Sequence, residues 1–250
     1  MAYFKKEEDI RPLFESQLEI CGVDYFDFYL MHAQSAEIFK RFKACRAYET
    51  AFELKKEGKI RHVGISFHDR AEVLDEILRE YPQIEVVQIQ LNYVDFDDPA
   101  VQSRKCYEVC RKRGKPVIVM EPVKGGNLVK LPDAAKQVFE DLHGGSPASY
   151  AIRFAAGFPG ILMVLSGMSN IKQMKDNISF MQNFQPLTDA EMEAVRKVQD
   201  IFRFMHRIAC TACRCCTDGC PQHLPIRELL EQVAAAPRRA PPSSPPPMRC

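Results

Sequence analysis

The densest chemistry in the sequence is a run of cysteines near the carboxyl end. Five of the ten cysteines fall within Cys210–Cys220, and four of these have the spacing C-x2-C-x2-C-x3-C ahead of Pro221. Thiolates spaced in this way in a tight loop can bind several corners of one iron–sulfur cubane. The pattern therefore predicts a [4Fe–4S] cluster, and its ligands would be Cys210, Cys213, Cys216 and Cys220.

Two other interpretations of the cysteine run stay open, a zinc site and a chance cluster. Zinc sites more often use two separated C-x2-C pairs or include histidine, so the spacing favours iron and sulfide. In two-cluster ferredoxins the fourth cysteine of such a run ligates the other cluster, so the role of Cys220 in this cluster is open. Cys215 lies off the spacing and is interpreted as a bystander.

A second set of chemically capable residues follows short apolar runs. The set comprises His32, Ser66, His68, Asn92, Glu121 and the segment 166–170. The apolar runs predict strands at 25–31, 61–66, 85–91, 116–120 and 161–166. Apolar residues at helical spacing predict helices at 7–21, 48–57, 71–80, 100–112, 147–156, 171–181 and 189–201, the last after the N-cap-like Thr188.

Strands that alternate with helices indicate βαβ units and a parallel sheet. Five such strands fit either a doubly wound sheet or part of a (β/α)8 barrel. A doubly wound dinucleotide domain carries G-x-G-x-x-G after its first strand, whereas residues 31–35 read Met-His-Ala-Gln-Ser. Polar residues at the carboxyl end of each strand are typical of barrel enzymes. The predicted fold class is therefore α/β, of the (β/α)8 TIM-barrel type and incomplete.

Composition and charge exclude several classes of protein. The net charge of +1 gives no reason to expect a nucleic-acid partner. No apolar run is long enough to span a bilayer, and the first residues contain no secretory h-region. The clustering of the cysteines argues against a disulfide scaffold. We expect a cytoplasmic protein in a reducing compartment, with no membrane partner.

The pattern changes after residue 200. We expect a barrel domain over 1–200 and a ferredoxin-like iron–sulfur segment over 201–233, with a short helix at 224–233. Residues 234–250 are rich in Ala, Pro, Ser and Arg, a composition that cannot form a core and predicts a disordered tail.

Five ordered motifs in the chain resemble an aldo-keto reductase. They are Phe26–His32, Gly58–Ser66, Gln88–Tyr93, Glu121–Gly126 and Ser166–Asn170. The cysteine run resembles the subfamily with a C-terminal ferredoxin-like domain. This resemblance implies a (β/α)8 barrel, a nicotinamide cofactor, NAD(P)H, and a catalytic tetrad of Asp, Tyr, Lys and His. His32 matches the tetrad histidine, which orients the substrate carbonyl.

The resemblance also implies residues that hold the cofactor. Ser66 and Gln90 match the positions that bind the nicotinamide carboxamide. The positions at the adenosine phosphate end are Gly167, Met168, Ser169, Gln173 and Asn177. Many NADPH-preferring members have a basic residue in place of Gln173, so the choice between NAD and NADP is open.

By the order of the family, the five strands match the fourth to the eighth of the barrel. We therefore expect an N-terminal truncation that removes the Asp, Tyr and Lys of the tetrad. The implied function is a nicotinamide-dependent carbonyl/alcohol oxidoreductase with an electron-transferring cluster, impaired in this form. The implied partners are a small carbonyl substrate and a redox partner protein. The alternative is a non-catalytic iron–sulfur electron-transfer or binding module.

Overall fold

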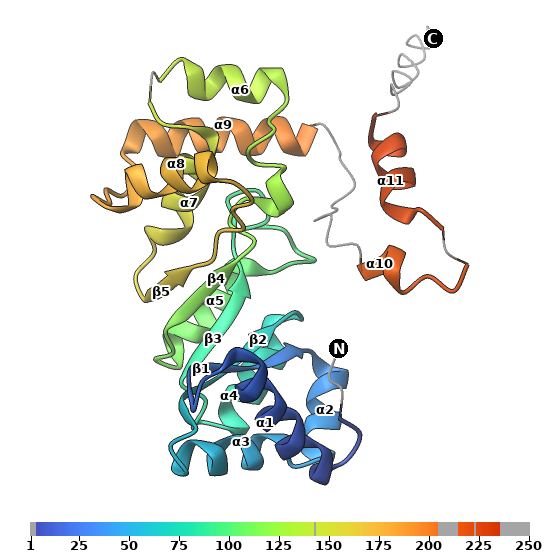
Figure 1. The fold of residues 1–250 in the computed structure, drawn as a ribbon. Coiled ribbons are helices and arrows are strands. Elements are labelled where there is room, and N and C mark those ends of the chain that lie inside the picture. Colours follow the sequence, from blue (N-terminus) through green and yellow to red (C-terminus); the bar gives the residue numbers. More distant parts are fainter. Residues whose placement is uncertain (1–3, 143, 205–214, 223, 236–250) are drawn as a thin grey trace, which may run out of the picture. The chain divides into compact units, whose positions relative to one another are not determined.

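The computed structural model describes residues 4–142, 144–204, 215–222 and 224–235 (Figure 1). The chain divides into two compact units, Met1–Gln199 and Asp200–Cys250. Each unit is described by itself. Among the described residues, no helix is both long enough and apolar enough to cross a membrane.

Strands and helices alternate along the first unit. The strands are β1 (Phe26–Gln34), β2 (Ile60–Phe67), β3 (Val86–Gln90), β4 (Val117–Met120) and β5 (Ile161–Val164). The helices up to β3 are η1 (Glu7–Asp9), α1 (Ile10–Cys21), α2 (Ala36–Ala44), α3 (Ala47–Lys56) and α4 (Ala71–Glu80). Those that follow are α5 (Ser103–Lys112), η2 (Lys124–Gly126), α6 (Asp133–Glu140), α7 (Pro147–Ala156), α8 (Ile171–Met181) and α9 (Asp189–Phe204).

The five strands form one parallel sheet in the order β1-β2-β3-β4-β5. Each strand pairs with the next one in the sequence, and helical crossovers connect them, as parallel pairing requires. The prediction of an α/β fold with a parallel sheet and five strands at these places is confirmed. Within the described residues the sheet has two edges, β1 and β5.

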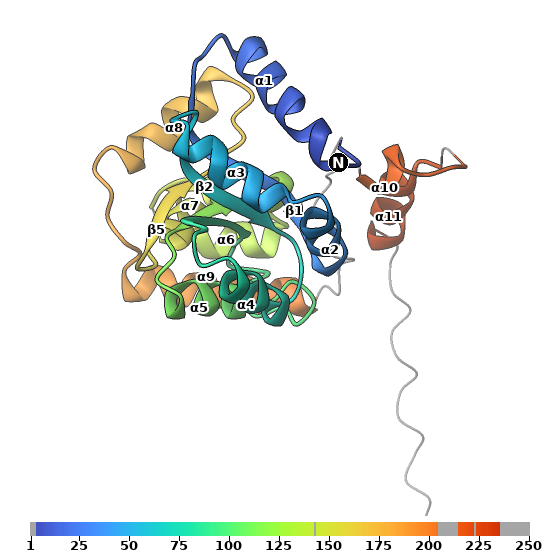
Figure 2. The same ribbon diagram turned by 90° about the horizontal axis from the view of Figure 1, so that it is seen from below.

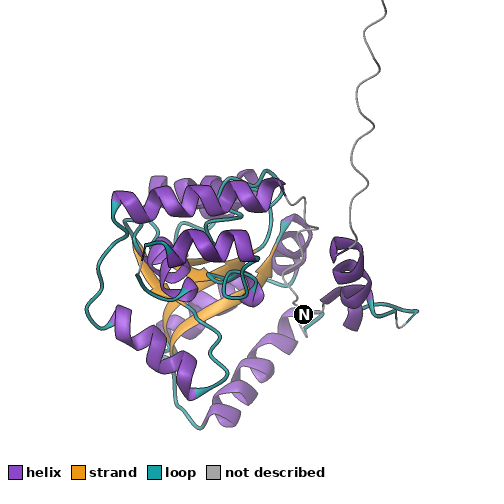
Figure 3. Ribbon diagram, turned by 90° about the horizontal axis from the view of Figure 1, so that it is seen from above, coloured by secondary structure: helices purple, strands orange, loops and turns teal. Residues whose placement is uncertain are grey.

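The two faces of the sheet differ in polarity. Side chains alternate between the faces of a strand. One face is apolar and fully buried, with Val63, Ile65, Val87, Ile89 and Val119. The other face is mixed, because it carries the polar Ser66, Gln88 and Gln90 together with Gly64 and the apolar Val86 and Ile118, which pair with Gly64 and Gln88. Helix α3 packs against β2 and α5 against β3, and Figures 2 and 3 show the strands enclosed among helices.

Local signals account for several helix starts. Ser146 caps α7 by accepting a hydrogen bond from the Ser149 amide, and Pro147 occupies the first turn. The predicted N-cap Thr188 is confirmed: its Oγ1 accepts from the Glu191 amide (3.3 Å), and the Glu191 carboxylate accepts from the Thr188 amide (2.8 Å). This reciprocal pair is a capping box, and it fixes the start of α9.

Several details differ from the sequence-based expectations. Strand β1 continues to Gln34, so His32 lies inside the strand rather than after it. Helices α2 and α6 were not predicted, although Ser35 caps α2 by accepting from the Ile38 amide. Helix α5 begins at Ser103 rather than at residue 100. The cause is a turn at Asp98, whose Oδ1 accepts from the amides of Ala100 (2.8 Å) and Val101 (3.2 Å) and holds them outside the helix.

The second unit contains two helices among its described residues, α10 (Cys215–Asp218) and α11 (Ile226–Ala235). Helix α11 confirms the short helix expected over 224–233, shifted by two residues. Cys210, Cys213 and the tail 236–250 lie outside the described residues, so the structure does not test the predictions made for them.

A substitution of Gly64 tests the packing on the face of the sheet that carries Ser66 and Gln90. A Cβ at this position would lie 2.5 Å from side-chain atoms of Leu30 and Val86 and 2.7 Å from the Val86 carbonyl oxygen. Because a backbone atom cannot swing aside, Gly64→Ala is expected to lower the free energy of unfolding by about 1–3 kcal/mol in denaturant titrations. Gly167→Ala is the control, since nothing lies within 4 Å of its added Cβ. Equal effects of the two substitutions would contradict this account.

Candidate active site at the carboxyl ends of the strands

The predicted site residues of the first unit lie at the carboxyl ends of the strands: His32, Ser66 and Gln90 are among the last residues of β1, β2 and β3, and the other positions follow β5 or lie on α8. Because the strands are parallel, these ends all lie at the same edge of the sheet (Figure 1). Open parallel sheets and barrels both bind ligands at this edge. Ser66 and Gln90 lie on the same face, because Ser66 pairs with Gln88, and Gln90 follows two residues later.

His32 lies on an exposed, irregular part of β1, where the pairing with β2 shifts register between Met31 and Gln34. The next residue, Ala33, has a φ of 52°, in the left-handed region. The backbone amide of Ala33 donates to Ser66 Oγ (2.8 Å), and the side-chain Nε2 of Gln34 donates to the His32 carbonyl (3.1 Å). This irregular end of β1 is also tied to the residue after β2, because the His68 amide donates to the Gln34 carbonyl (2.9 Å). Ser66 thus holds the backbone beside His32.

His32 and His68 interact electrostatically at this edge of the sheet. Desolvation lowers the pKa of His32. Desolvation also lowers the pKa of His68, and the charge of His32 lowers it further. Both rings are therefore neutral at neutral pH, and each has one donor and one acceptor nitrogen. His68 and Gln90 border one cavity of about 210 Å³.

His32 borders a different cavity, of about 390 Å³, between α1, β1 and α3. Its lining is largely apolar and includes Phe14, Leu30 and Leu54. A hydrogen bond from the Tyr29 hydroxyl to Gln17 Oε1 (2.9 Å) crosses from β1 to α1. His32 is therefore a polar residue in the lining of a largely apolar cavity.

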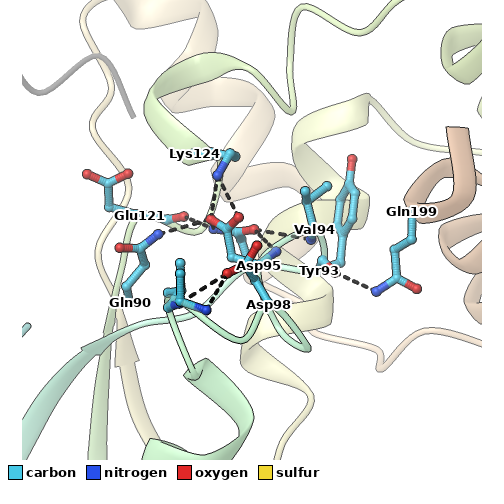
Figure 4. Close-up of polar contacts among 11 residues, drawn as sticks. Gln90, Tyr93, Val94, Asp95, Asp98, Glu121, Lys124 and Gln199 are labelled. Carbon is cyan, nitrogen blue, oxygen red and sulfur yellow. Dashed lines mark hydrogen bonds and ion pairs between the residues drawn. The ribbon is translucent and has the colours of Figure 1, made fainter. Parts of the chain in front are cut away.

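The loops after β3 and β4 are joined by a buried ion pair that was not predicted (Figure 4). Lys124 Nζ lies 2.6 Å from both carboxylate oxygens of Asp95. Asp95 Oδ2 also accepts from Asn92 Nδ2 (2.9 Å) and from Gln90 Nε2 (3.0 Å). Asn92 Oδ1 in turn accepts from the Asp95 amide (2.9 Å). The loop is also held from α9, where Gln199 Nε2 donates to the Tyr93 carbonyl.

Lys124 belongs to the Glu121–Gly126 motif, which contains two adjacent glycines. Lys124, Gly125 and Gly126 form the short helix η2, and all three have positive φ. The ammonium group of Lys124 points into the protein and is neutralised by Asp95. The loop therefore offers no free lysine charge at this position.

Glu121 is the first residue after β4 and also has a positive φ, of 58°. Its Oε2 is buried without a hydrogen-bond partner among the described residues. Burial raises the pKa of Glu121, the Lys124 ammonium opposes this rise, and the Asp95 carboxylate adds to it. The Glu121 carboxyl group therefore takes up a proton more readily than a carboxyl group in water.

The segment after β5 forms a compact polar turn at the start of α8. Gln173 Oε1 accepts from the amide (2.7 Å) and the hydroxyl (3.1 Å) of Ser169, and Asn170 caps the helix by accepting from the Gln173 amide (3.0 Å). The buried Asn177 donates to Ser166 Oγ (2.7 Å). Met168 is exposed, and Gly167 has open space around it. Four of the five predicted positions therefore lie around the amino terminus of α8, and Asn177, in its second turn, reaches back to Ser166.

The cysteine run is only partly described. Cys216 is exposed and Cys220 is half-buried, and both are free thiols. The described residues contain no group of three or more His, Cys, Asp or Glu side chains that could hold a metal. Since Cys210 and Cys213 lie outside them, the iron–sulfur cluster stays a prediction.

Comparison with known proteins places this site in a family. Residues 2–200 match the model of the Aldo/keto reductase family, and the chain belongs to this family. It is 31% identical over 121 residues to an NADH-specific methylglyoxal reductase of Escherichia coli, which covers 48% of the chain and 35% of that protein. It is 28% identical over 141 residues to a glyoxal reductase of Bacillus subtilis, covering 56% and 46%.

The fold comparison agrees with the family. An aldo-keto reductase from Klebsiella pneumoniae, solved in complex with NADPH, superposes with a TM-score of 0.61 at 18% identity and covers 78% of this chain and 66% of that one. The match to the E. coli reductase spans about a third of that protein, and the match to the B. subtilis reductase spans about half. The fold is therefore that of aldo-keto reductases over the part that the chain shares with them.

Glu121 predicts a pH dependence of stability. Because burial raises its folded-state pKa, the carboxyl favours the folded state below its unfolded pKa, and this contribution is lost as the pH rises through the folded pKa. Glu121→Gln cannot titrate, so it is expected to gain about 1 kcal/mol over the wild type at pH 7 and to approach it at pH 4, by denaturant unfolding at each pH.

Asp75→Asn is the control of opposite sign. The Arg113 side chain donates to Asp75 and lowers its pKa, so this carboxylate stabilises the fold above its unfolded pKa. Asp75→Asn should therefore be less stable than the wild type at pH 7. A Glu121→Gln variant that behaves like Asp75→Asn would contradict the assignment of a buried, unpartnered carboxyl at Glu121.

Proposed function

We propose that this chain binds a nicotinamide dinucleotide at the carboxyl ends of its strands and takes part in carbonyl/alcohol oxidoreduction of the aldo-keto reductase type. The observation that carries the proposal is the polar edge itself, where His32, Ser66 and Gln90 lie on neighbouring parallel strands. A bound nicotinamide would supply or accept the hydride. The residues of the chain would bind the cofactor and orient the carbonyl.

The hydrogen-bonding capacity of Ser66 and Gln90 fits a carboxamide. The Ser66 oxygen accepts from the Ala33 amide, which leaves its O–H free to donate. The Gln90 amide group donates to Asp95, which leaves Oε1 free to accept. One donor and one acceptor on adjacent strands match the C=O and the NH2 of a carboxamide. This complementarity supports the roles implied for both residues by the family resemblance.

The turn at the start of α8 fits the phosphate end of a dinucleotide. Helix amino termini favour anions, and Gly167, Met168, Ser169, Gln173 and Asn177 gather there. The neutral Gln173 gives no added charge for a 2′-phosphate, while Lys172 and Lys175 lie on the same helix. One relative is an NADH-specific reductase, and one structural neighbour contains NADPH, so both NAD and NADP belong in the test.

His32 would orient the carbonyl. A neutral imidazole can donate one hydrogen bond to the oxygen, and hydride addition at the carbon leaves an oxyanion that needs a proton. Tyr93 does not suit the role of acid, because it is fully buried and burial raises the pKa of its hydroxyl. His68 is exposed and close to His32, but its lowered pKa leaves it mostly unprotonated at pH 7. Slow proton delivery therefore limits the reaction.

A titration of NADH and NADPH followed by aldehyde assays tests this proposal. The names of two relatives suggest methylglyoxal and glyoxal as carbonyl probes. We expect weak dinucleotide binding and reduction at no more than trace rates. His32→Ala should lower the rate by about tenfold or more and leave dinucleotide binding within twofold, because the imidazole acts on the carbonyl.

His62→Ala is the matched control, since His62 lies on β2 away from this edge and stacks on Phe28. It should change neither binding nor rate. Failure of the wild-type chain to bind either dinucleotide would overturn the proposal. Turnover at ordinary enzyme rates, about 1–10³ s⁻¹, would instead show that the chain contains an efficient acid.

We further propose that Cys210, Cys213, Cys216 and Cys220 hold one [4Fe–4S] cluster that exchanges electrons with a redox partner protein. The spacing of the cysteines and Pro221 support this proposal, and a cytoplasmic, reducing location suits it. A non-catalytic iron–sulfur module is the second candidate function. The family membership of residues 2–200 favours the oxidoreductase over that module.

Anaerobic purification tests the cluster. We expect a brown protein with about four iron and four sulfide ions per chain, the content of this cluster type. Cys213→Ser should lose the cluster. Cys215→Ser is the control and should keep it, because Cys215 lies off the spacing. A colourless protein with stoichiometric zinc would contradict the iron–sulfur assignment.

A further inference from the structure

The buried ion pair between Lys124 and Asp95 lies beside Gln90, which donates a hydrogen bond to Asp95 (Figure 4). Its side chains are 8% and 3% exposed, and they come from the loops after β4 and β3. Removing two charges from water is costly, and a buried pair often contributes little net stability over apolar residues of the same volume. Net stability therefore does not account for this ion pair, and its effect on neighbouring residues has to be considered.

The Asp95 carboxylate fixes the orientation of the Gln90 amide. A carboxylate can only accept hydrogen bonds, so the group that Gln90 turns toward it must be the NH2. Asn92 donates to the same oxygen and occupies the other approach to it. Gln90 Oε1 then points away from the pair and has no hydrogen-bond partner among the described residues. Gln90 is thus presented to the site as an acceptor.

We propose that Asp95, paired with Lys124, is a positioning residue that presents Gln90 Oε1 to the NH2 of a nicotinamide carboxamide. The inference rests on the proposed function, because it names how that cofactor would be recognised. With the ion pair intact, a rotated Gln90 would place its carbonyl oxygen against the carboxylate, which is repulsive. Without the carboxylate charge, both orientations of the amide become accessible.

A cofactor analogue separates this role from a structural one. In 3-acetylpyridine adenine dinucleotide a methyl group replaces the carboxamide NH2. The wild-type chain is expected to bind NAD⁺ about fivefold more tightly than the analogue, the value of one hydrogen bond to a neutral acceptor. Calorimetric titration of each dinucleotide gives this ratio without any turnover.

Asp95→Asn is the decisive variant. The new amide can accept from or donate to Gln90, so Gln90 no longer has a fixed orientation. The ratio of the two affinities should fall from about five to near one. A ratio that stays near five in Asp95→Asn would overturn the proposal.

Glu191→Gln provides the matched control for the loss of an ion pair. Glu191 pairs with Arg153 at 2.7 Å between α7 and α9, with side chains 16% and 13% exposed. Both variants replace a partly or fully buried carboxylate by its amide, so both should lower the melting temperature. Only Asp95→Asn should change the affinity ratio, which a merely structural role for Asp95 would not do.

Lys124→Arg covers the case in which Asp95→Asn does not fold. It keeps a cation beside the carboxylate, so Asp95 stays charged, and the orientation of Gln90 and the ratio near five should both persist. Collapse of the ratio in this variant would contradict the assignment of the orienting role to Asp95.

The outcomes also separate this inference from the proposed function. If the wild-type chain binds neither dinucleotide, the proposed function fails and this inference fails with it. If it binds both with equal affinity, the proposed function stands and the positioning role of Asp95 is wrong.

Discussion

Parallel pairing of β1 to β5 is the constraint on which the rest of the site depends. A parallel strand must return through a crossover, so every carboxyl end, and the loop that leaves it, lies at the same edge. His32, Ser66 and Gln90 are 34 and 24 residues apart in the sequence, yet the register places Ser66 and Gln90 on one face of adjacent strands. No local feature of the chain needs to bring them together.

The edge alone does not fix side-chain orientation, and the loops supply what it lacks. Ser66 accepts from the Ala33 amide and so ties the irregular end of β1 beside His32 to β2. Asp95 accepts from Gln90 and binds Lys124, which ties the loop after β3 to the loop after β4. In both cases one hydrogen-bonding capacity of a site residue is used by the protein: Ser66 accepts a bond and can still donate its O–H, and Gln90 donates through Nε2 and can still accept at Oε1. The supporting contacts thus determine which atom faces a ligand.

The sequence predicted the strands and the positions that end them, because apolar runs and the polar residues after them are local signals. It did not predict the ion pair, since Asp95 and Lys124 are 29 residues apart and meet only when two loops are folded. The start of α5 was missed for a related reason: the turn at Asp98 competes with the helix for the amides of Ala100 and Val101. Pattern and propensity do not resolve such competition between side chain and backbone.

The charges around Gln90 suggest why a buried ion pair serves this position better than neutral groups. A neutral amide or hydroxyl partner can both donate and accept, so it would tolerate either orientation of Gln90. A carboxylate tolerates one, and a carboxylate buried without a cation would be far more costly than a paired one. Lys124 is then the counter-charge that lets Asp95 stay charged at 3% exposure. Opposite charges from two loops thereby define a single acceptor atom at the end of β3.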